Sequence, residues 1–218
     1  MSLATSTNPV VVPLTGADTA LADAGVFYTA LTPTPGTGVV GPVSTTFDET
    51  KALMTVFNGG LLTVYPKYLR LHLTVIGTTG TGVRFTQIVD QGNRLSSGGT
   101  NLVPNNTNMS VGNSSAAAIT YGALVTTAAS GKRRVLFNKL FKSDAIEVIN
   151  ETYQFSWGGP TQLEDPTSLI NNAATLAHTS YAFGPVAIGP QQSFVIHQWR
   201  AAITVGITFE VEFGYVEK

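Results

Sequence analysis

Three histidines are the side chains of this 218-residue chain best suited to proton transfer or metal binding: His72, His178 and His197. A metal site would require them to converge, since catalytic zinc is held by three protein ligands. His72 and His197 each lie within an alternating apolar–polar pattern, and His178 ends a weakly helical stretch at 168–178. Nothing in the spacing brings the three together. Histidines at the surface, or satisfied inside the fold, are therefore the simpler interpretation.

Carboxylates and nucleophiles give no stronger indication of catalysis. Glu210 and Glu212 are spaced so that both point to the same side of an extended strand, which favours a solvated sheet face over a general acid–base pair. No Gly-x-Ser-x-Gly motif is present, and the absence of cysteine excludes disulfides, thiolate metal ligands and cysteine nucleophiles. We therefore predict a protein that is not an enzyme and has no cofactor and no metal.

Two glycine-containing segments have part of the spacing of phosphate-binding loops. Residues 36–41 read G-T-G-V-V-G, but prolines flank this segment where a dinucleotide site needs a strand and a helix. Gly131-Lys132 is followed by Arg133, where a phosphate-binding loop requires Ser or Thr for magnesium. Both segments are predicted to be turns.

Positive charge is concentrated in one segment that includes Lys132, Arg133, Arg134, Lys139 and Lys142. Apolar residues are interleaved with these cations at Val135, Leu136, Phe137, Leu140 and Phe141. A solvated loop would explain the charges alone, whereas the apolar side chains favour docking onto a partner. The candidate interface residues are Lys132, Arg133, Arg134, Phe137 and Phe141, together with Val10, Val11 and Val12 of the N-terminal segment.

Composition limits the possible partners and environments. Only 11% of the residues are charged, against about 25% in a typical soluble domain. A neutral hydroxyl and amide surface suits a protein that is packed against neighbours. The net charge of −1 makes nucleic acid an improbable general partner. The N-terminus does not resemble a secretory signal and no apolar run reaches 18 residues, so we expect synthesis in a cytoplasm and no membrane insertion.

Hydrophobic periodicity predicts an all-β fold. From Ile203 to Tyr215 every second residue is apolar, which indicates one long half-buried strand. Asn58-Gly59-Gly60 predicts a hairpin turn between two short strands at 53–57 and 61–65. Further strands are expected at 69–75, 83–89, 117–125, 135–141, 146–149, 153–157, 182–188 and 194–199, and a long polar loop at 90–114. The fold class is therefore an antiparallel β-sandwich, jelly-roll-like, or else a barrel.

The chain is expected to divide near residue 46. Residues 1–46 contain five prolines and almost no charge, which favours an extended N-terminal arm laid over the domain or over a neighbouring subunit. A disordered tail is the alternative, and the low charge and many apolar residues argue against it. Short strands are possible within it at 10–14 and 26–31. Residues 47–218 are predicted to form a single β-sandwich domain.

Three segments give the chain a loose resemblance to small virion proteins of tailed bacteriophages of the capsid decoration or cement type. They are L-S-S-G-G-T-N-L-V-P-N-N-T-N-M (95–109), I-G-P-Q-Q-S-F-V-I-H-Q-W (188–199) and F-E-V-E-F-G-Y-V-E-K (209–218). The resemblance implies a β-sandwich that oligomerises on the capsid surface and bridges major capsid subunits. It covers mainly residues 82–218 and does not extend to residues 1–46, and it transfers no catalytic or binding residue.

The sequence thus leaves three functions open. The first is a non-enzymatic structural virion protein, made in a bacterial host without a signal peptide, that binds the major capsid protein or other virion proteins and forms a homo-oligomer such as a dimer or trimer. The second is a carbohydrate- or receptor-binding module of a phage fibre or adhesin, for which Tyr153, Trp157, Tyr181 and Trp199 are the candidate aromatics. The third is a jelly-roll enzyme, which would need the three histidines to meet at a metal.

Overall fold

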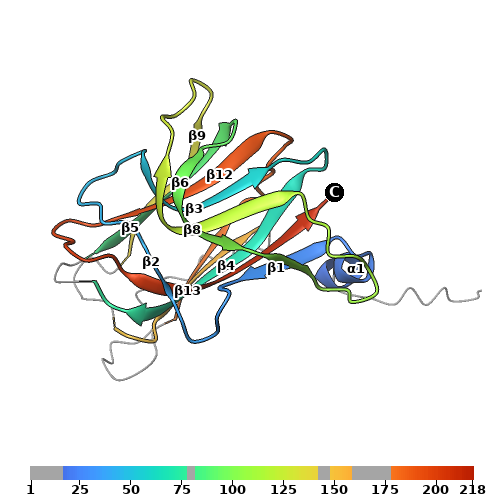
Figure 1. Cartoon of the computed structure of the whole chain (residues 1–218), viewed down its shortest axis with the longest axis horizontal. Coiled ribbons are helices and arrows are strands. Elements are labelled where there is room, and N and C mark those ends of the chain that lie inside the picture. The colour runs from blue at the N-terminus through green and yellow to red at the C-terminus, as the bar shows by residue number, and fades with distance from the viewer. Residues whose placement is uncertain (1–16, 78–81, 142–147, 159–177) are drawn as a thin grey trace, which may run out of the picture.

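The computed structural model describes residues 17–77, 82–141, 148–158 and 178–218, and within them the chain forms two β-sheets packed face to face (Figure 1). Sheet A contains, in spatial order, β11 (His178–Phe183), β10 (Thr152–Trp157), β4 (Val64–Val75), β13 (Thr208–Glu217), β1 (Phe27–Leu31) and β7 (Pro104–Asn106), and β2 (Val39–Val40) pairs with the start of β13. Sheet B contains β6 (Leu95–Leu102), β8 (Ala117–Thr126), β3 (Lys51–Asn58), β12 (Gln192–Trp199), β5 (Val83–Gln91) and β9 (Arg134–Phe141).

All strand pairs are antiparallel except β10 with β11, so the structure confirms the predicted all-β sandwich. The jelly-roll connectivity stays a prediction. One short helix, α1 (Ala17–Asp23), lies beside β1 at one end of the sandwich (Figure 1).

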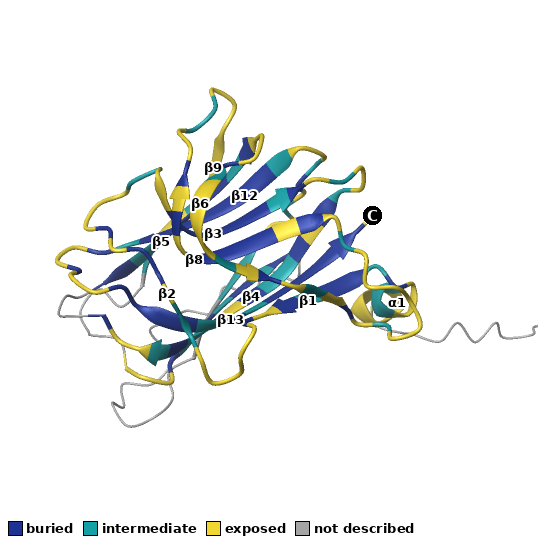
Figure 2. Cartoon of the chain, in the orientation of Figure 1, coloured by how far each residue is buried: buried dark blue, intermediate teal, exposed yellow. Residues whose placement is uncertain are grey.

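Strand β13 shows how the alternating sequence produces the two layers. Phe209, Val211 and Phe213 are buried between the sheets, while Glu210 and Glu212 lie on the outer face of sheet A. The buried surfaces of both sheets face one another across the sandwich (Figure 2). Burial of these side chains, at about 1.5–3 kcal/mol each, is the main force that holds the layers together.

Aromatic rings fill one side of this core. Trp157 is buried and lies 5.5 Å, centroid to centroid, from Phe194 of the opposite sheet and 6.4 Å from Phe155. Its indole Nε1 donates a hydrogen bond to Oε1 of Gln87 at 3.2 Å, which satisfies the polar atom of a ring that is otherwise surrounded by carbon.

The predicted hairpin at Asn58-Gly59-Gly60 is wrong. β3 pairs with β8 and β12 in sheet B, whereas β4 pairs with β10 and β13 in sheet A, so this turn carries the chain from one sheet to the other. Asn58 is buried, and its amide donates to the carbonyl oxygens of Leu62 and Ile188 at 2.6 and 2.9 Å. The asparagine therefore stabilises a connection between the two sheets. The hairpin interpretation fails because no local sequence signal specifies which strands pair.

Four further predictions of where strands lie are wrong in whole or in part. The segment 90–114 contains β6 and β7, because Gly98 and Gly99 adopt positive φ angles of 84° and 77° and allow β6 to follow β8 through irregular register. The C-terminal strand begins at Thr208 and not at Ile203. Residues 148–149 are not in a strand, and the strand expected at 182–188 occurs earlier, as β11.

The N-terminal region is partly built into the sandwich. β1 lies between β13 and β7, and β2 pairs with β13 through Thr208 and Phe209. Residues 27–31 and 39–40 are therefore part of sheet A. The predicted strand at 10–14, including Val10, Val11 and Val12, lies outside the described residues. So does the helical stretch predicted at 168–178, except for His178, which begins β11.

Candidate interaction surface

β9 is the last strand of sheet B, and among the described strands it pairs only with β5. Arg134, Val135 and Leu136 are exposed, the two aliphatic side chains by 53% and 45%. Gln87 of β5 pairs with Phe137 and Ile88 with Val135, so Leu136 is the extra residue of a β-bulge. We call residues 132–139 the basic edge, because they unite exposed cations, exposed aliphatic groups and an unpaired strand edge.

The inward side of the basic edge is fixed by aromatic packing. Phe137 is partly buried against the core, and its ring lies 4.5 Å from that of Phe183 and 6.3 Å from that of Tyr181. Lys139 places its ammonium 5.9 Å above the Tyr181 ring. Phe137, a candidate interface residue by sequence, thus packs mainly against β11. The side chain of the other aromatic candidate, Phe141, is not among those that the structure describes.

The cations of the basic edge differ in how they are paired. Arg133 forms an ion pair with Glu49 of the loop before β3. Within the described residues no carboxylate lies at ion-pair distance from Lys132 or Arg134, and both side chains are exposed. Two positive charges are therefore presented to solvent beside the exposed Val135 and Leu136.

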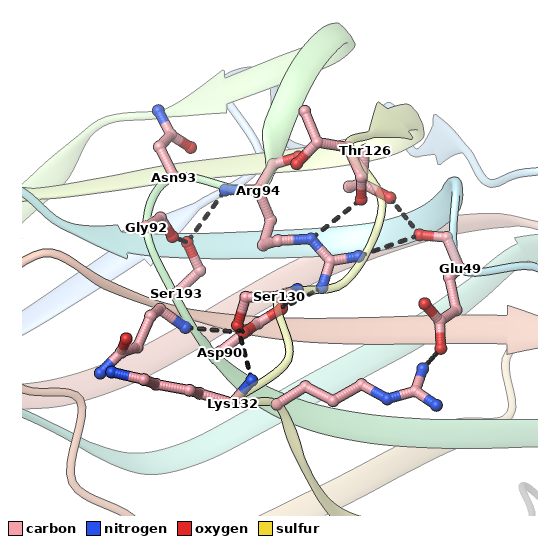
Figure 3. Close-up of polar contacts among 12 residues, drawn as sticks. Glu49, Asp90, Gly92, Asn93, Arg94, Thr126, Ser130, Lys132 and Ser193 are labelled. Carbon is pink, nitrogen blue, oxygen red and sulfur yellow. Dashed lines mark hydrogen bonds and ion pairs between the residues drawn. The ribbon is translucent and has the colours of Figure 1, made fainter.

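A buried polar network holds the turn that leads into this edge (Figure 3). Asp90, at the end of β5, accepts hydrogen bonds from the side-chain hydroxyl of Ser130 and, at 3.0 Å, from its backbone amide. The Ser130 hydroxyl in turn accepts from the backbone amide of Lys132 at 3.1 Å. The position of the basic edge is thus determined by one carboxylate of the neighbouring strand.

Arg94 supplies the counter-charge for Asp90. Its Nη1 lies 2.5 Å from Oδ2 of Asp90, and the side chains of Asp90 and Arg94 are 0% and 2% exposed. The same guanidinium donates to the carbonyl oxygens of Thr127 at 2.9 Å and Glu49 at 3.4 Å (Figure 3). Because these contacts join three loops, the ion pair fastens the edge of sheet B as one unit. Sequence inspection missed the pair, whose only signal is an arginine in a polar segment with few charges.

The protonation state of Asp90 follows from its surroundings. Burial alone would raise the pKa of this carboxyl group. The hydrogen bonds from the Ser130 hydroxyl and amide, from the backbone amide of Gln91 and from Arg94 outweigh burial and lower the pKa below its usual value. Asp90 is therefore ionised at neutral pH, as a salt bridge with Arg94 requires.

The three histidines lie on three different strands. His197 is buried on β12, its Nδ1 lies 3.0 Å from the carbonyl oxygen of Lys51, and burial lowers its pKa. His72, on β4, lies 3.3 Å through Nδ1 from the hydroxyl of Thr152. His178 begins β11. Within the described residues no three His, Asp or Glu side chains are grouped so as to hold a metal ion.

A second polar cluster lies on the outer face of sheet A. The Tyr68 hydroxyl donates to one oxygen of Glu212 at 2.6 Å, and Arg70 approaches the other oxygen at 3.2 Å. Arg70 also lies 5.0 Å from the Tyr68 ring centre. Glu210 accepts a hydrogen bond from the backbone amide of Gly36. These groups satisfy one another, so the two glutamates belong to a polar sheet face, as their spacing suggests.

The four aromatic residues considered for saccharide binding do not form a common platform. Tyr153 and Trp157 are buried in the core. Tyr181 packs against Phe137 and Phe183, and Trp199 lies under the guanidinium of Arg84 at 5.1 Å.

Comparison with known proteins gives no match: no family model fits the chain, and no curated protein or solved structure is significantly similar to it. In the described part of the chain, no helix has the length and apolar character needed to span a membrane.

Proposed function

We propose that this chain is a non-enzymatic structural protein that works by contact with other protein chains, as a decoration or cement subunit of a bacteriophage capsid. The observation that carries the proposal is the basic edge. It combines a strand edge, the exposed side chains of Val135 and Leu136, and the cations Lys132 and Arg134, for which the described residues offer no ion-pair partner. Aromatic and aliphatic groups combined with arginine are typical of protein–protein contacts.

The composition supports the same function. A chain with 11% charged residues has little charge repulsion to keep copies apart, so repeated packing on a lattice suits it better than free diffusion at high concentration. A stable interface buries roughly 1,600 Å², and a symmetric shell repeats that contact many times. Weak contacts at each site then suffice for durable attachment.

The proposal is tested by measuring assembly of the full chain. Light scattering from about 1 to 100 µM gives the oligomeric state, and co-sedimentation with capsids of the phage that encodes the chain tests attachment. We expect wild-type protein to sediment with capsids, and the variant Arg134→Glu/Val135→Glu to bind at least ten-fold more weakly.

The matched control is Leu61→Glu/Lys218→Glu, which also replaces one exposed aliphatic side chain and one exposed cation by glutamate, on segments that do not pair with β9. Equal attachment of the wild type, the β9 variant and the control would refute a role for the basic edge. A monomer that binds no capsid at any concentration would refute the proposed function.

A further inference from the structure

We infer that the basic edge receives an acidic, extended segment of another protein, which adds to β9 as a further strand of sheet B. This inference rests on the proposed function and specifies the chemistry of the partner.

The backbone of β9 provides the first requirement. It has eight residues and spans about 27 Å at roughly 3.4 Å per residue, which is long enough to pair with a strand of ordinary length. One side pairs with β5 from Val83 to Val89, and no described strand pairs with the other. An edge strand offers a row of backbone donors and acceptors, and strand addition is a recurrent mode of peptide recognition.

The side chains determine the charge of the incoming strand. Lys132 and Arg134 are exposed and have no carboxylate at ion-pair distance within the described residues, in contrast to Arg133. Side chains on adjacent strands lie 4.5–5.5 Å apart, so a carboxylate of an added strand would reach Arg134 on β9. A carboxylate of a segment that extends past the start of β9 would meet Lys132, which lies in the preceding turn. Val135 and Leu136 offer apolar contact between the charges. A segment in which Glu or Asp alternates with Val or Thr fits this surface.

The same charges disfavour a second copy of β9 as the occupant. Two β9 edges related by a two-fold axis would bring lysine and arginine opposite lysine and arginine, which is destabilising. Cations and a bulge on an edge strand are also a known defence against unwanted pairing. Cationic side chains at the edge disfavour pairing with neutral or basic strands, whereas the carboxylates of an acidic strand would pair with them. The cations would therefore select an acidic partner.

Single-stranded nucleic acid fits the surface less well. Proteins that bind single strands without sequence preference combine cations with exposed aromatic rings on which the bases stack. Phe137, the aromatic residue of β9 whose side chain is described, is packed on Phe183. The exposed groups between the cations are aliphatic, which suits an extended peptide.

A labelled peptide tests the inference on the full-length protein. The probe is Thr-Glu-Val-Glu-Val-Glu-Thr-Glu-Val-Thr, its binding is followed by fluorescence anisotropy, and its counterpart has lysine at every glutamate. We expect the acidic peptide alone to bind, and its affinity to fall at least ten-fold in the variant Lys132→Glu/Arg134→Glu. These positions are exposed, so an unchanged urea midpoint verifies that the variant is folded.

Two further peptides distinguish strand addition from charge attraction. In one the odd-numbered amides are N-methylated, and in the other the even-numbered amides. The backbone amides of alternate residues in a strand point to the same neighbouring strand. We therefore expect methylation of the amides that face β9 to abolish binding, and methylation of the other set to leave it unchanged. Equal binding of both would overturn strand addition, and so would tighter binding of a thymidine 20-mer than of the peptide.

The result also separates this inference from the proposed function. A chain that attaches to capsids but does not bind the acidic peptide overturns the strand-addition inference alone. A chain that binds the peptide through Lys132 and Arg134 but attaches to no capsid supports the inference and overturns the proposed function.

Discussion

Replacing Asp90 by Asn removes one charge from the network that holds the basic edge while keeping the shape of the side chain. In the native protein the carboxylate faces Arg94 at 2.5 Å, and neither side chain is appreciably exposed. The variant leaves the Arg94 guanidinium buried without its counter-charge. The change should lower the free energy of unfolding, since a buried charge needs both an opposite charge and hydrogen bonds.

The structure allows the expected loss to be bracketed. Removing one partner of a buried ion pair costs about 3–5 kcal/mol. The Asn side-chain oxygen can still accept from the Ser130 amide, and Arg94 keeps its hydrogen bond to the Thr127 carbonyl oxygen at 2.9 Å. We therefore expect a loss near the lower limit, about 3 kcal/mol. A domain with the usual 5–15 kcal/mol of stability would remain folded.

Urea unfolding at pH 7 measures this loss as a shift of the midpoint at constant slope. The matched control is Glu212→Gln, which breaks the Arg70–Glu212 pair on the outer face of sheet A, where the side chains are 48% and 31% exposed. An exposed pair contributes about 0–1 kcal/mol. The variant Asp90→Asn/Arg94→Met should lose less than the sum of its two single changes, because it leaves no unpaired charge.

The pH dependence gives an independent measurement. Because the folded state lowers the pKa of Asp90, its contribution is present above the unfolded pKa of about 3.9 and is lost as the pH falls through the lower folded value. The difference between wild type and Asp90→Asn should therefore shrink in acid. A loss at pH 7 no larger than that of Glu212→Gln would refute the inference that this pair is closed to water.

Two other changes test separate parts of the fold. Gly214→Ala should lower the free energy of unfolding by about 1–3 kcal/mol in urea, because the new Cβ would overlap the Tyr68 ring, whose Cζ would lie at 2.6 Å. Gly112→Ala is the control, since its new Cβ would meet no atom within 4 Å, and it should cost little. Equal losses for the two variants would contradict this packing. Burial lowers the pKa of His197, so its contribution to stability is present above the unfolded value of about 6.5 and declines as the pH falls below it. His197→Gln should flatten the pH 7.5 to 5.5 dependence of the urea midpoint, and an unchanged slope would disprove the assignment.

Local alternation predicted strand positions well. β3, β5, β8, β9, β10 and β12 each lie within a residue or two of the expected ranges, because a half-buried strand leaves a period of two in its own sequence. Pairing is a different property. The turn at Asn58 resembles a hairpin signal, yet β3 and β4 belong to different sheets, and that choice depends on partner strands that are distant in the sequence.

The candidate surface was predicted in part. The sequence drew attention to Lys132, Arg133 and Arg134, but it did not separate the paired cation from the unpaired ones. That distinction depends on Glu49, which is distant in sequence and meets Arg133 only after β3 and β9 take their places in sheet B. Phe137, a candidate interface residue by sequence, packs against Phe183 of β11. The bulge at Leu136 sets the direction of its side chain, and a bulge leaves no trace in hydrophobic periodicity.

The low charge content gives the unpaired cations their significance. In the described part of the chain, cations are largely engaged within the fold: Arg94 with Asp90, Arg133 with Glu49, and Lys67 with Asp18. A protein with so few charges would gain solubility by spreading them. Yet Lys132 and Arg134, which have no ion-pair partner among the described residues, lie together at the start of β9 beside exposed aliphatic groups. Solubility alone does not call for that arrangement, whereas recognition of an acidic strand does, because each charge then contributes to the choice of partner.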